Sequence, residues 1–290
     1  MSEEKQWQGD GQEKSGREKV EQQEGESREA GERSAPSAKI VYKTILKEGE
    51  EELGRTSAAL FWSGLAAGLS MSFSMIAEGL LVAHLPEAGW RPLVSKLGYT
   101  LGFLIVVLGR QQLFTENTLT AILPLLKRKP HATLANVLRL WAVVLVANLL
   151  GTLLVALVAA RTEAFDYEVR KAFVEIAHKT LEHGFLTTLL RAVFAGWLIA
   201  LMVWLLPFAE TARVWVIIII TYVVGVGHFG HIIAGAVDVF TLAAGGHTTW
   251  AHVFSAFIAP TLIGNTLGGV LLVAMLNHAQ VVAGGEGEDV

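Results

Sequence analysis

The chain has 290 residues with a mean hydropathy of +0.46, and 52% of them are hydrophobic, which argues against a soluble globular protein. The formal net charge of -4 arises within the first 38 residues, where ten Asp/Glu accompany six Lys/Arg and leave 17 of each sign for the rest of the chain. The main body therefore has no basic excess that would favour nucleic acid. Cysteine is absent, which excludes disulfides, thiolate nucleophiles and cysteine-ligated metals.

The leading segment, residues 1–38, is rich in Glu, Gln, Gly, Lys and Ser and has almost no aliphatic side chains. Such a segment cannot bury enough apolar surface to offset its ordering entropy, so we expect a disordered acidic tail. It is not a signal peptide, because it is acidic and has no apolar core segment. Residues 39–56 place apolar side chains at helical spacing, and we expect an amphipathic lead-in helix that lies solvated at the membrane surface.

Membrane-length apolar segments follow between residues 57 and 277, and a short tail, 278–290, ends the chain. A spanning helix needs about 20 mostly apolar residues. The sequence therefore predicts an all-α membrane protein with six transmembrane helices. The expected spans are Ser57–Leu85, Gly98–Leu126, Arg139–Ala160, Phe185–Leu206, Val214–Ala244 and Val253–Leu276.

Spans two and five are long and internally interrupted. Span two contains "GRQQLFTENT" (109–118), a polar run between apolar stretches, and span five contains "VVGVGHFGHIIAG" (223–235), which is rich in glycine and carries two histidines. Irregular backbone at membrane depth is tolerated only where protein buries it or where it lines a cavity. Interruptions at matching positions of two three-helix halves indicate a pathway between inverted repeats.

A sequence echo supports the two halves. Span three carries "NLLGTLLV" (148–155) and span six carries "NTLGGVLLV" (265–273), and both keep an Asn-x-x-Gly pattern. Small residues at such positions let membrane helices approach closely. We therefore expect spans three and six to occupy equivalent places.

The interrupted segments also carry a family resemblance. "GRQQLFTENT" resembles the Gly-x-x-Leu-Phe-Thr loop of the formate/nitrite transporter family, with one residue inserted before the Leu. "GHFGHIIAG" resembles that family's second broken helix, and "APTLIGNTLGGVLLV" its last helix. The resemblance covers Ser57 to Asn277, and the acidic tail with the Gln-Gln-Leu-Phe-Thr-Glu-Asn loop is similar to a less characterised branch of the family.

The resemblance implies an aquaporin-like fold with helices two and five broken. It further implies a homopentamer in the lipid bilayer of the inner membrane that conducts small monovalent anions through each protomer. No enzymatic activity, cofactor, metal or nucleic-acid partner follows from it. Formate, nitrite, hydrosulfide, acetate and lactate are all small enough, so the anion is left open.

The resemblance also assigns roles to individual residues. Thr115 would be the loop threonine that contacts the central pore histidine, His231, and Lys179 would be the vestibule lysine in the loop before span four. Asn265 and Gly196 would be supporting residues. The constriction residues would be Phe103, Leu113, Phe114 and Ile199 on the cytoplasmic side and Tyr99 and Val224 on the periplasmic side.

Three positions depart from the family pattern. The pair Tyr99 and Val224 stands where two Phe residues are common, which makes this constriction more polar and less symmetric. Gly196 stands where the family has an Asn near the histidine. Arg110 stands where a small residue is usual, and its positive charge could attract anions near the loop.

Simpler alternatives exist for the ionisable and polar residues of the interrupted spans. His231 could be a core histidine bonded to a backbone carbonyl, although ionisable groups inside a membrane are expensive and favour a functional reading. His228 has no motif support and is interpreted as structural. Its spacing from His231 could suit a metal or haem ligand pair, but further ligands are lacking nearby. Thr115 could also cap the half-helix that follows it. Glu116 is favourable in the first turn of a helix, which we prefer to a proton-carrying role.

Two further charged residues have ordinary interpretations. Glu78, late in span one, is expected at the membrane interface. Lys179 lies in a connection with both charge signs, so a solvated surface lysine is nearly as good an explanation as an anion attractor.

These residues suggest a mechanism. An anion alone pays a large desolvation cost in an apolar constriction. A histidine, whose unperturbed pKa is about 6.5, could lend a proton or a hydrogen bond there, so that a weak acid crosses as its neutral form in a pH-dependent way. An aquaporin-like channel for neutral solutes is one alternative, although paired Asn-Pro-Ala caps are absent from the sequence. A non-conducting membrane sensor or scaffold is another.

The distribution of basic residues predicts the orientation. Lys and Arg concentrate in the lead-in segment and in "LLKRKPHATLANVLR" (125–139), which favours the cytoplasmic side for both. The connection before span four also carries basic residues and weakens this bias. With six spans both termini share a side, and we expect both in the cytoplasm.

Overall fold

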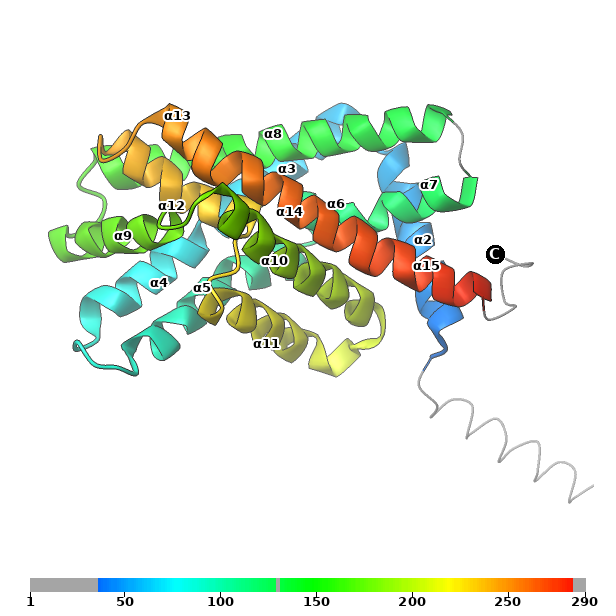
Figure 1. Ribbon diagram of the computed structural model, residues 1–290, viewed down its shortest axis with the longest axis horizontal. Helices are drawn as coiled ribbons and strands as arrows, with labels where there is room; N and C mark the ends of the chain where they lie inside the picture. Colours follow the sequence, from blue (N-terminus) through cyan, green and yellow to red (C-terminus); the bar gives the residue numbers. More distant parts are fainter. Residues whose placement is uncertain (1–35, 129–130, 284–290) are drawn as a thin grey trace, which may run out of the picture. The chain divides into compact units, whose positions relative to one another are not determined.

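The computed structural model describes residues 36–128 and 131–283, and within these ranges every regular element is a helix (Figure 1). The predicted all-α class is therefore confirmed for the part of the chain that is described. Of the expected acidic tail, residues 1–35 lie outside the described ranges, and so do residues 284–290 at the other end.

The helices follow the expected order of spans, with one lead-in helix and one helix between the two halves. The first half comprises α3 (Ser57–Met71), α4 (Phe73–His84), α5 (Arg91–Leu108), α6 (Phe114–Thr120), α7 (Ile122–Arg128) and α8 (His131–Arg161). The second half comprises α10 (Phe185–Leu205), α11 (Arg213–Val226), α12 (Ile232–Ala244), α13 (Trp250–Val253), α14 (Ala259–Gly269) and α15 (Leu276–Val281). The lead-in helix is α2 (Ala38–Gly54), and α9 (Tyr167–Thr180) joins the halves.

Five helical stretches among the described residues are long and apolar enough to cross a membrane. They begin at Ser57, Arg91, His131, Phe185 and Trp250. The expected fifth span is divided instead into α11, with 14 residues, and α12, with 13. At 1.5 Å per residue the two together rise about 40 Å, more than the hydrocarbon core of a bilayer. The count of six crossings stays a prediction that rests on this pair.

The second span begins earlier than expected. We predicted its start at Gly98, but α5 begins at Arg91 and has Pro92 in its first turn. Proline is compatible with that turn because the first amide groups of a helix have no intrahelical partner. The polar residues between Arg91 and Gly98 therefore belong to the first turns of a helix rather than to a loop.

The connection before span four is also a helix. We expected a polar loop there, but α9 buries Val169, Ala172, Phe173 and Ile176 along one face and packs against α4 and α12. Its charged residues occupy the other face, which explains why composition alone resembled a loop. The last helix likewise continues to Val281, beyond the predicted end of the membrane domain at residue 277.

The two halves repeat the same packing. Helix α3 lies along α8, and α10 lies along α14 (Figure 1). Glycines let both pairs of helices approach closely. A Cβ atom on Gly68 would lie only 2.1 Å from the carbonyl oxygen of Asn148, and a Cβ atom on Gly196 would lie only 2.2 Å from the carbonyl oxygen of Asn265, so neither position has room for a side chain. Gly196, where the resemblance expected an asparagine, thus serves a close helix contact.

The short helix that follows each interruption packs against helices of the other half. Helix α6 packs against α10 and α14 of the second half, while α12 packs against α3 and α8 of the first. Each interruption is therefore held by both halves, which places the two loops in the interior of the bundle.

The lead-in helix is not simply solvated at a surface. Its apolar face, including Val41, Tyr42, Ile45 and Leu46, is buried, and the helix packs against α6, α7 and α15. The hydroxyl of Tyr42 is 2.8 Å from Nδ1 of His278 on α15. The expectation of a solvated helix was wrong for this face, because its apolar side chains are covered by protein.

Candidate functional site

The two helix interruptions share one backbone path. Helix α5 ends at Leu108 and α6 begins at Phe114, whereas α11 ends at Val226 and α12 begins at Ile232. In each loop the second residue is left-handed, Arg110 with φ 51° and His228 with φ 50°, and these are the only non-glycine residues with positive φ in the described chain. Side chains rarely adopt this conformation. The left-handed conformation recurs at the second residue of both loops, which shows that the two loops are structurally equivalent.

One asparagine holds the first loop. Asn148 on α8 accepts a hydrogen bond at Oδ1 from the amide of Phe114 at 3.0 Å. Its Nδ2 donates to the carbonyl oxygens of Gly64, at 2.7 Å, and Gln112, at 2.9 Å. A single buried side chain thus satisfies a free amide of α6 and a loop carbonyl, and joins both to α3.

Asn265 on α14 makes the same set of bonds for the second loop. Its Oδ1 accepts from the amide of Ile232 at 2.8 Å, and its Nδ2 donates to the carbonyl oxygens of Ala192 and Gly230, both at 2.8 Å. The Asn-x-x-Gly echo between spans three and six therefore corresponds to equivalent hydrogen bonds. Sequence reasoning named Asn265 as a support but missed Asn148 as its counterpart.

The two interruptions meet at a histidine and a threonine. Thr115 Oγ1 on α6 lies 2.8 Å from His231 Nε2, and both side chains are buried. His231 is also the N-cap of α12, where its Nδ1 accepts a hydrogen bond from the amide of Ala234 at 3.1 Å. Because Nδ1 is an acceptor, the proton of the neutral ring belongs on Nε2 and is donated to Thr115. This arrangement leaves the hydroxyl hydrogen of Thr115 available to a ligand.

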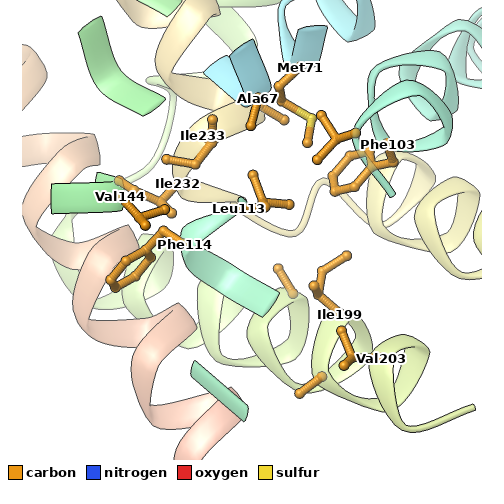
Figure 2. Close-up of a cluster of buried hydrophobic side chains, with 14 of the residues drawn as sticks. Ala67, Met71, Phe103, Leu113, Phe114, Val144, Ile199, Val203, Ile232 and Ile233 are labelled. Atoms are coloured by element: carbon orange, nitrogen blue, oxygen red, sulfur yellow. The ribbon is translucent and has the colours of Figure 1, made fainter. Parts of the chain in front are cut away.

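Aromatic and aliphatic side chains surround this pair. The ring of Phe103 lies edge-on to that of His231 with centroids 4.9 Å apart, and Tyr99 follows at 5.4 Å from Phe103. Leu113 and Ile199 are also fully buried and lie near Phe103 in Figure 2. Of the predicted constriction residues, Phe103 therefore contacts His231 directly, and Tyr99 packs against Phe103.

Phe114 occupies a different place from the one expected. Figure 2 shows it beside Val144 and Ile232, turned away from Phe103. Its ring packs edge-on against Trp141 of α8 with centroids 5.9 Å apart. This packing argues against a role for Phe114 in the same constriction as Phe103.

A small chamber of about 60 Å³, the inner chamber, reaches His231 from one side. Tyr99 and Val224, the residues of the predicted periplasmic constriction, are among its lining residues. Its remaining lining is unexpectedly rich in charge. The ionisable residues besides His231 are Lys96, Lys179, His183, Arg191, His228 and Asp238. Lys96 and Asp238 were missed by sequence reasoning, although each is a charged residue close to or within an apolar stretch, which is a signal for function.

A wider chamber of about 340 Å³, the outer chamber, shares Lys96, Lys179, Thr180 and His228 with the inner one. Lys179 lies in the last turn of α9, and its Nζ is 2.8 Å from Oε1 of Glu175. This hydrogen bond keeps the pKa of Glu175 below its ordinary value. Lys179 is half exposed, so the structure places it at a chamber but already paired.

Glu78 is not at an exposed interface. It lines the outer chamber, is 3% exposed, and forms an ion pair with Lys96, whose Nζ lies 2.6 Å from Oε1. Glu78 is buried because α4 is covered by α5 and α9, so that the end of span one faces protein.

A chamber of about 440 Å³ lies beside the first loop and is named here the loop chamber. Arg110 lines it and is within 3.6 Å of Glu48, so its positive charge is accompanied by a carboxylate rather than isolated. Glu116 lies in the first turn of α6, and its Oε1 is buried without a hydrogen-bond partner in the described structure. The charged lining comprises Glu48, Glu51, Glu52, Glu116, Arg55, Arg110 and Arg213.

Glu52 of the lead-in helix binds the first loop directly. Its carboxylate accepts hydrogen bonds from Gln112 Nε2 at 3.1 Å, Asn117 Nδ2 at 3.0 Å and Thr120 Oγ1 at 2.5 Å. Burial raises the pKa of Glu52 above its ordinary value, and the nearby Glu48 adds to this, while the three donors oppose it. Sequence reasoning missed this residue because the lead-in helix was expected to be solvated.

Two interrupted membrane helices that meet at a buried histidine, with a chamber that reaches this histidine, define a membrane channel or transporter. The formate/nitrite transporter family matches residues 39–279, and the chain belongs to this family. It is 39% identical over 265 residues to the inner membrane protein YfdC of Escherichia coli strain K12, covering 91% of this chain and 86% of that protein. It is 28% identical over 251 residues to the formate channel BtFdhC of Bacillus thuringiensis, covering 82% and 93%.

Solved structures share the fold. A pentameric formate channel with formate bound matches with a TM-score of 0.64 at 21% identity, covering 78% of this chain and 98% of that one. An FNT family ion channel matches with a TM-score of 0.71 at 18% identity, covering 83% and 99%. The predicted aquaporin-like class with two broken helices is thus confirmed at the level of the fold, and the chain is a multi-pass membrane protein.

Proposed function

We propose that the chain conducts small monovalent anions of weak acids, of the formate and nitrite kind, past His231 in a pH-dependent way. The observation that carries this proposal is the buried contact of 2.8 Å between Thr115 Oγ1 and His231 Nε2, at the point where the two interruptions meet. Family membership and the similarity to a formate channel support the substrate class.

The apolar residues around the pair act against a bare anion. Phe103, Leu113 and Ile199 offer no hydrogen bonds, so an anion loses its hydration there without compensation. At the pair, the Thr115 hydroxyl is the free hydrogen-bond donor, and His231 Nε2–H becomes a second donor to the anion when it leaves Thr115. They orient the anion at the point where it has least water.

Proton transfer can then lower the barrier further. The anion takes the proton from Nε2, while Nδ1 is released from the Ala234 amide and takes a proton from a hydronium ion, which becomes water. Once the acid has left, Nδ1 gives its proton to water and Nε2 takes one from water, which restores the cap. The ring is neutral before and after this step, and the substrate crosses as the neutral acid. Because the ring must acquire a proton in each cycle, flux depends on pH.

The test is transport by the purified chain in proteoliposomes, with formate, nitrite, hydrosulfide, acetate and lactate measured between pH 5 and pH 8. The proposal expects saturable anion flux that rises as the pH falls. An aquaporin-like channel would instead pass glycerol or water without pH dependence, and a sensor or scaffold would pass nothing. Either result contradicts the proposal.

We further propose a homopentamer in the inner membrane with both termini in the cytoplasm. The pentameric structural relative and the relative named as an inner membrane protein support the first two statements. The distribution of Lys and Arg in the sequence supports the third. Membership of a family of transporters supports transport rather than catalysis.

A further inference from the structure

The ion pair between Lys96 and Glu78 is buried at the junction of the outer and inner chambers. Lys96 Nζ lies 2.6 Å from Glu78 Oε1, and the two side chains are 13% and 5% exposed. The residues come from different helices, α5 and α4, which pack together.

Stability alone does not explain this pair. Removing two charges from water is expensive, and apolar side chains of similar volume often join two helices as well or better. Charged side chains in membrane proteins usually face the interior or a water-filled cavity and mark ion pathways. Glu78 near the end of span one and Lys96 near the start of span two are both buried and line these chambers.

The position of the ammonium is specific. Lys96 lines both chambers, whereas Glu78 lines the outer chamber and Asp238 the inner one. Asp238 is bonded at 3.1 Å to Thr180, which also lines both chambers. Lys96 Nζ lies 5.6 Å from the ring centroid of Tyr99, a residue of the predicted constriction. An anion that moves from the outer to the inner chamber therefore passes this ammonium before it reaches Tyr99.

We propose that Lys96 is an anion-binding site between the two chambers, at which a small monovalent carboxylate displaces Glu78 from the ammonium. An ammonium has three donors, and the carboxylate of Glu78 accepts a bond from one of them. Glu78 prevents the site from holding the anion too tightly, since conduction requires an ion to leave each site as well as enter it. This inference rests on the proposed function and specifies how its substrate is recognised.

The charged residues farther out do not provide the same site. Arg91 and Lys179 both contact Glu175, whose carboxylate is about half exposed. Exposed pairs are screened by water and salt and contribute little. The ammonium of Lys96 is buried at the junction of the two chambers, where water and salt screen its charge less.

The experiment measures formate uptake by the reconstituted chain and separates KM from the maximal rate. Lys96→Met should raise KM about tenfold or more, the loss expected for one charged hydrogen bond. Because this change leaves Glu78 buried and unpaired, the double variant Lys96→Met with Glu78→Gln is measured as well. It removes both charges and should show the same rise in KM.

Glu78→Gln alone keeps the shape and removes the competing charge. Its KM should fall severalfold, and its maximal rate should fall because release becomes slower. Glu87→Gln is the matched control, since Glu87 lines the same outer chamber but its carboxylate is 95% exposed beside Arg91. Its KM should equal that of the wild type.

If the ion pair between Lys96 and Glu78 only joins α4 to α5, a different outcome is expected. The variants would then yield less assembled protein, while KM per assembled molecule would stay unchanged. That result overturns the inference but leaves the proposed function in place, provided that the wild type transports formate. Absence of saturable formate uptake by the wild type would instead contradict the proposed function itself.

Discussion

At the scale of single residues, His231 has different partners at its two ring nitrogens. Nδ1 caps α12 through the amide of Ala234, while Nε2 faces Thr115. One nitrogen thus maintains the helix and the other is directed to the site. The two roles can be separated by substitution, because asparagine caps helices well but does not titrate near neutral pH.

His231→Asn is therefore expected to fold and assemble, and to lose the pH dependence of anion flux. Flux per assembled molecule at pH 5 and pH 8 measures this. His231→Phe is the contrasting variant, since it removes the cap, at about 1 kcal/mol, and leaves Thr115 without its partner. It should have no flux. An unaltered ratio between the two pH values in His231→Asn would refute the proton-transfer step.

Asn148 and Asn265 allow a second prediction at this scale. Each makes three hydrogen bonds to backbone groups, so Asn148→Leu and Asn265→Leu leave those groups unpaired. Each change should lower the free energy of unfolding by about 1–3 kcal/mol for every buried group left unpaired. Thermal unfolding in detergent measures the loss. Thr152→Val is the control on α8, because its hydroxyl bonds only to its own helix, at Leu149. Equal melting temperatures for Asn148→Leu and Thr152→Val would contradict the prediction.

At the scale of elements, α2 belongs to the site although it precedes the first span. Glu52 near its end joins Gln112, Asn117 and Thr120, so the lead-in helix contacts the same loop that presents Thr115. The position of the first loop thus depends on a helix outside the membrane-spanning segments. This dependence can be measured through the pKa of one carboxyl group.

Burial raises the pKa of Glu52 in the folded state above the ordinary value of 4.5. Its contribution to stability is therefore complete below pH 4.5 and is lost as the pH rises through the raised pKa. Glu52→Gln resembles the protonated carboxyl and does not titrate. The melting temperature of the variant should therefore exceed that of the wild type by more at pH 8 than at pH 5. A gap that stays constant, or that changes in the opposite direction, would show that the pKa is not raised.

At the scale of the whole molecule, the arrangement of apolar surface bears on assembly. Many large apolar side chains of α8, α10 and α11 are exposed in the single chain, as expected for surfaces that meet lipid or neighbouring protomers. The similarity to a pentameric channel favours a five-membered ring for some of this surface. Native mass spectrometry of the detergent-solubilised protein should show a pentamer, and a stable dimer or tetramer would refute this number.

Orientation is a separate prediction at this scale. A reporter that is active only in the cytoplasm, fused after Val290, should be active in cells. The matching fusion before Met1 should behave in the same way, because an even number of crossings places both termini on one side. Activity of a periplasmic reporter at either end would contradict the predicted topology.

The sequence alone determined the class of protein, the order of the spans, the two interruptions and the equivalence of spans three and six. These features are local, since membrane-length apolar runs, glycine-rich breaks and a repeated Asn-x-x-Gly pattern can be read along the chain. The resemblance also placed Thr115 and His231 on different spans and expected them to meet. The structure has them in contact, and their roles in transport stay predictions.

Tertiary structure decided the rest. The partners of Glu52, Lys96 and Asp238 are known only when α2, α5 and α12 are packed, because a charged residue near an apolar segment does not reveal its partner. Phe114 likewise turned toward Trp141, since a helix of seven residues directs neighbouring side chains to different faces. Local pattern determines which helices form, whereas the pairing of buried charges depends on contacts between residues far apart in the chain.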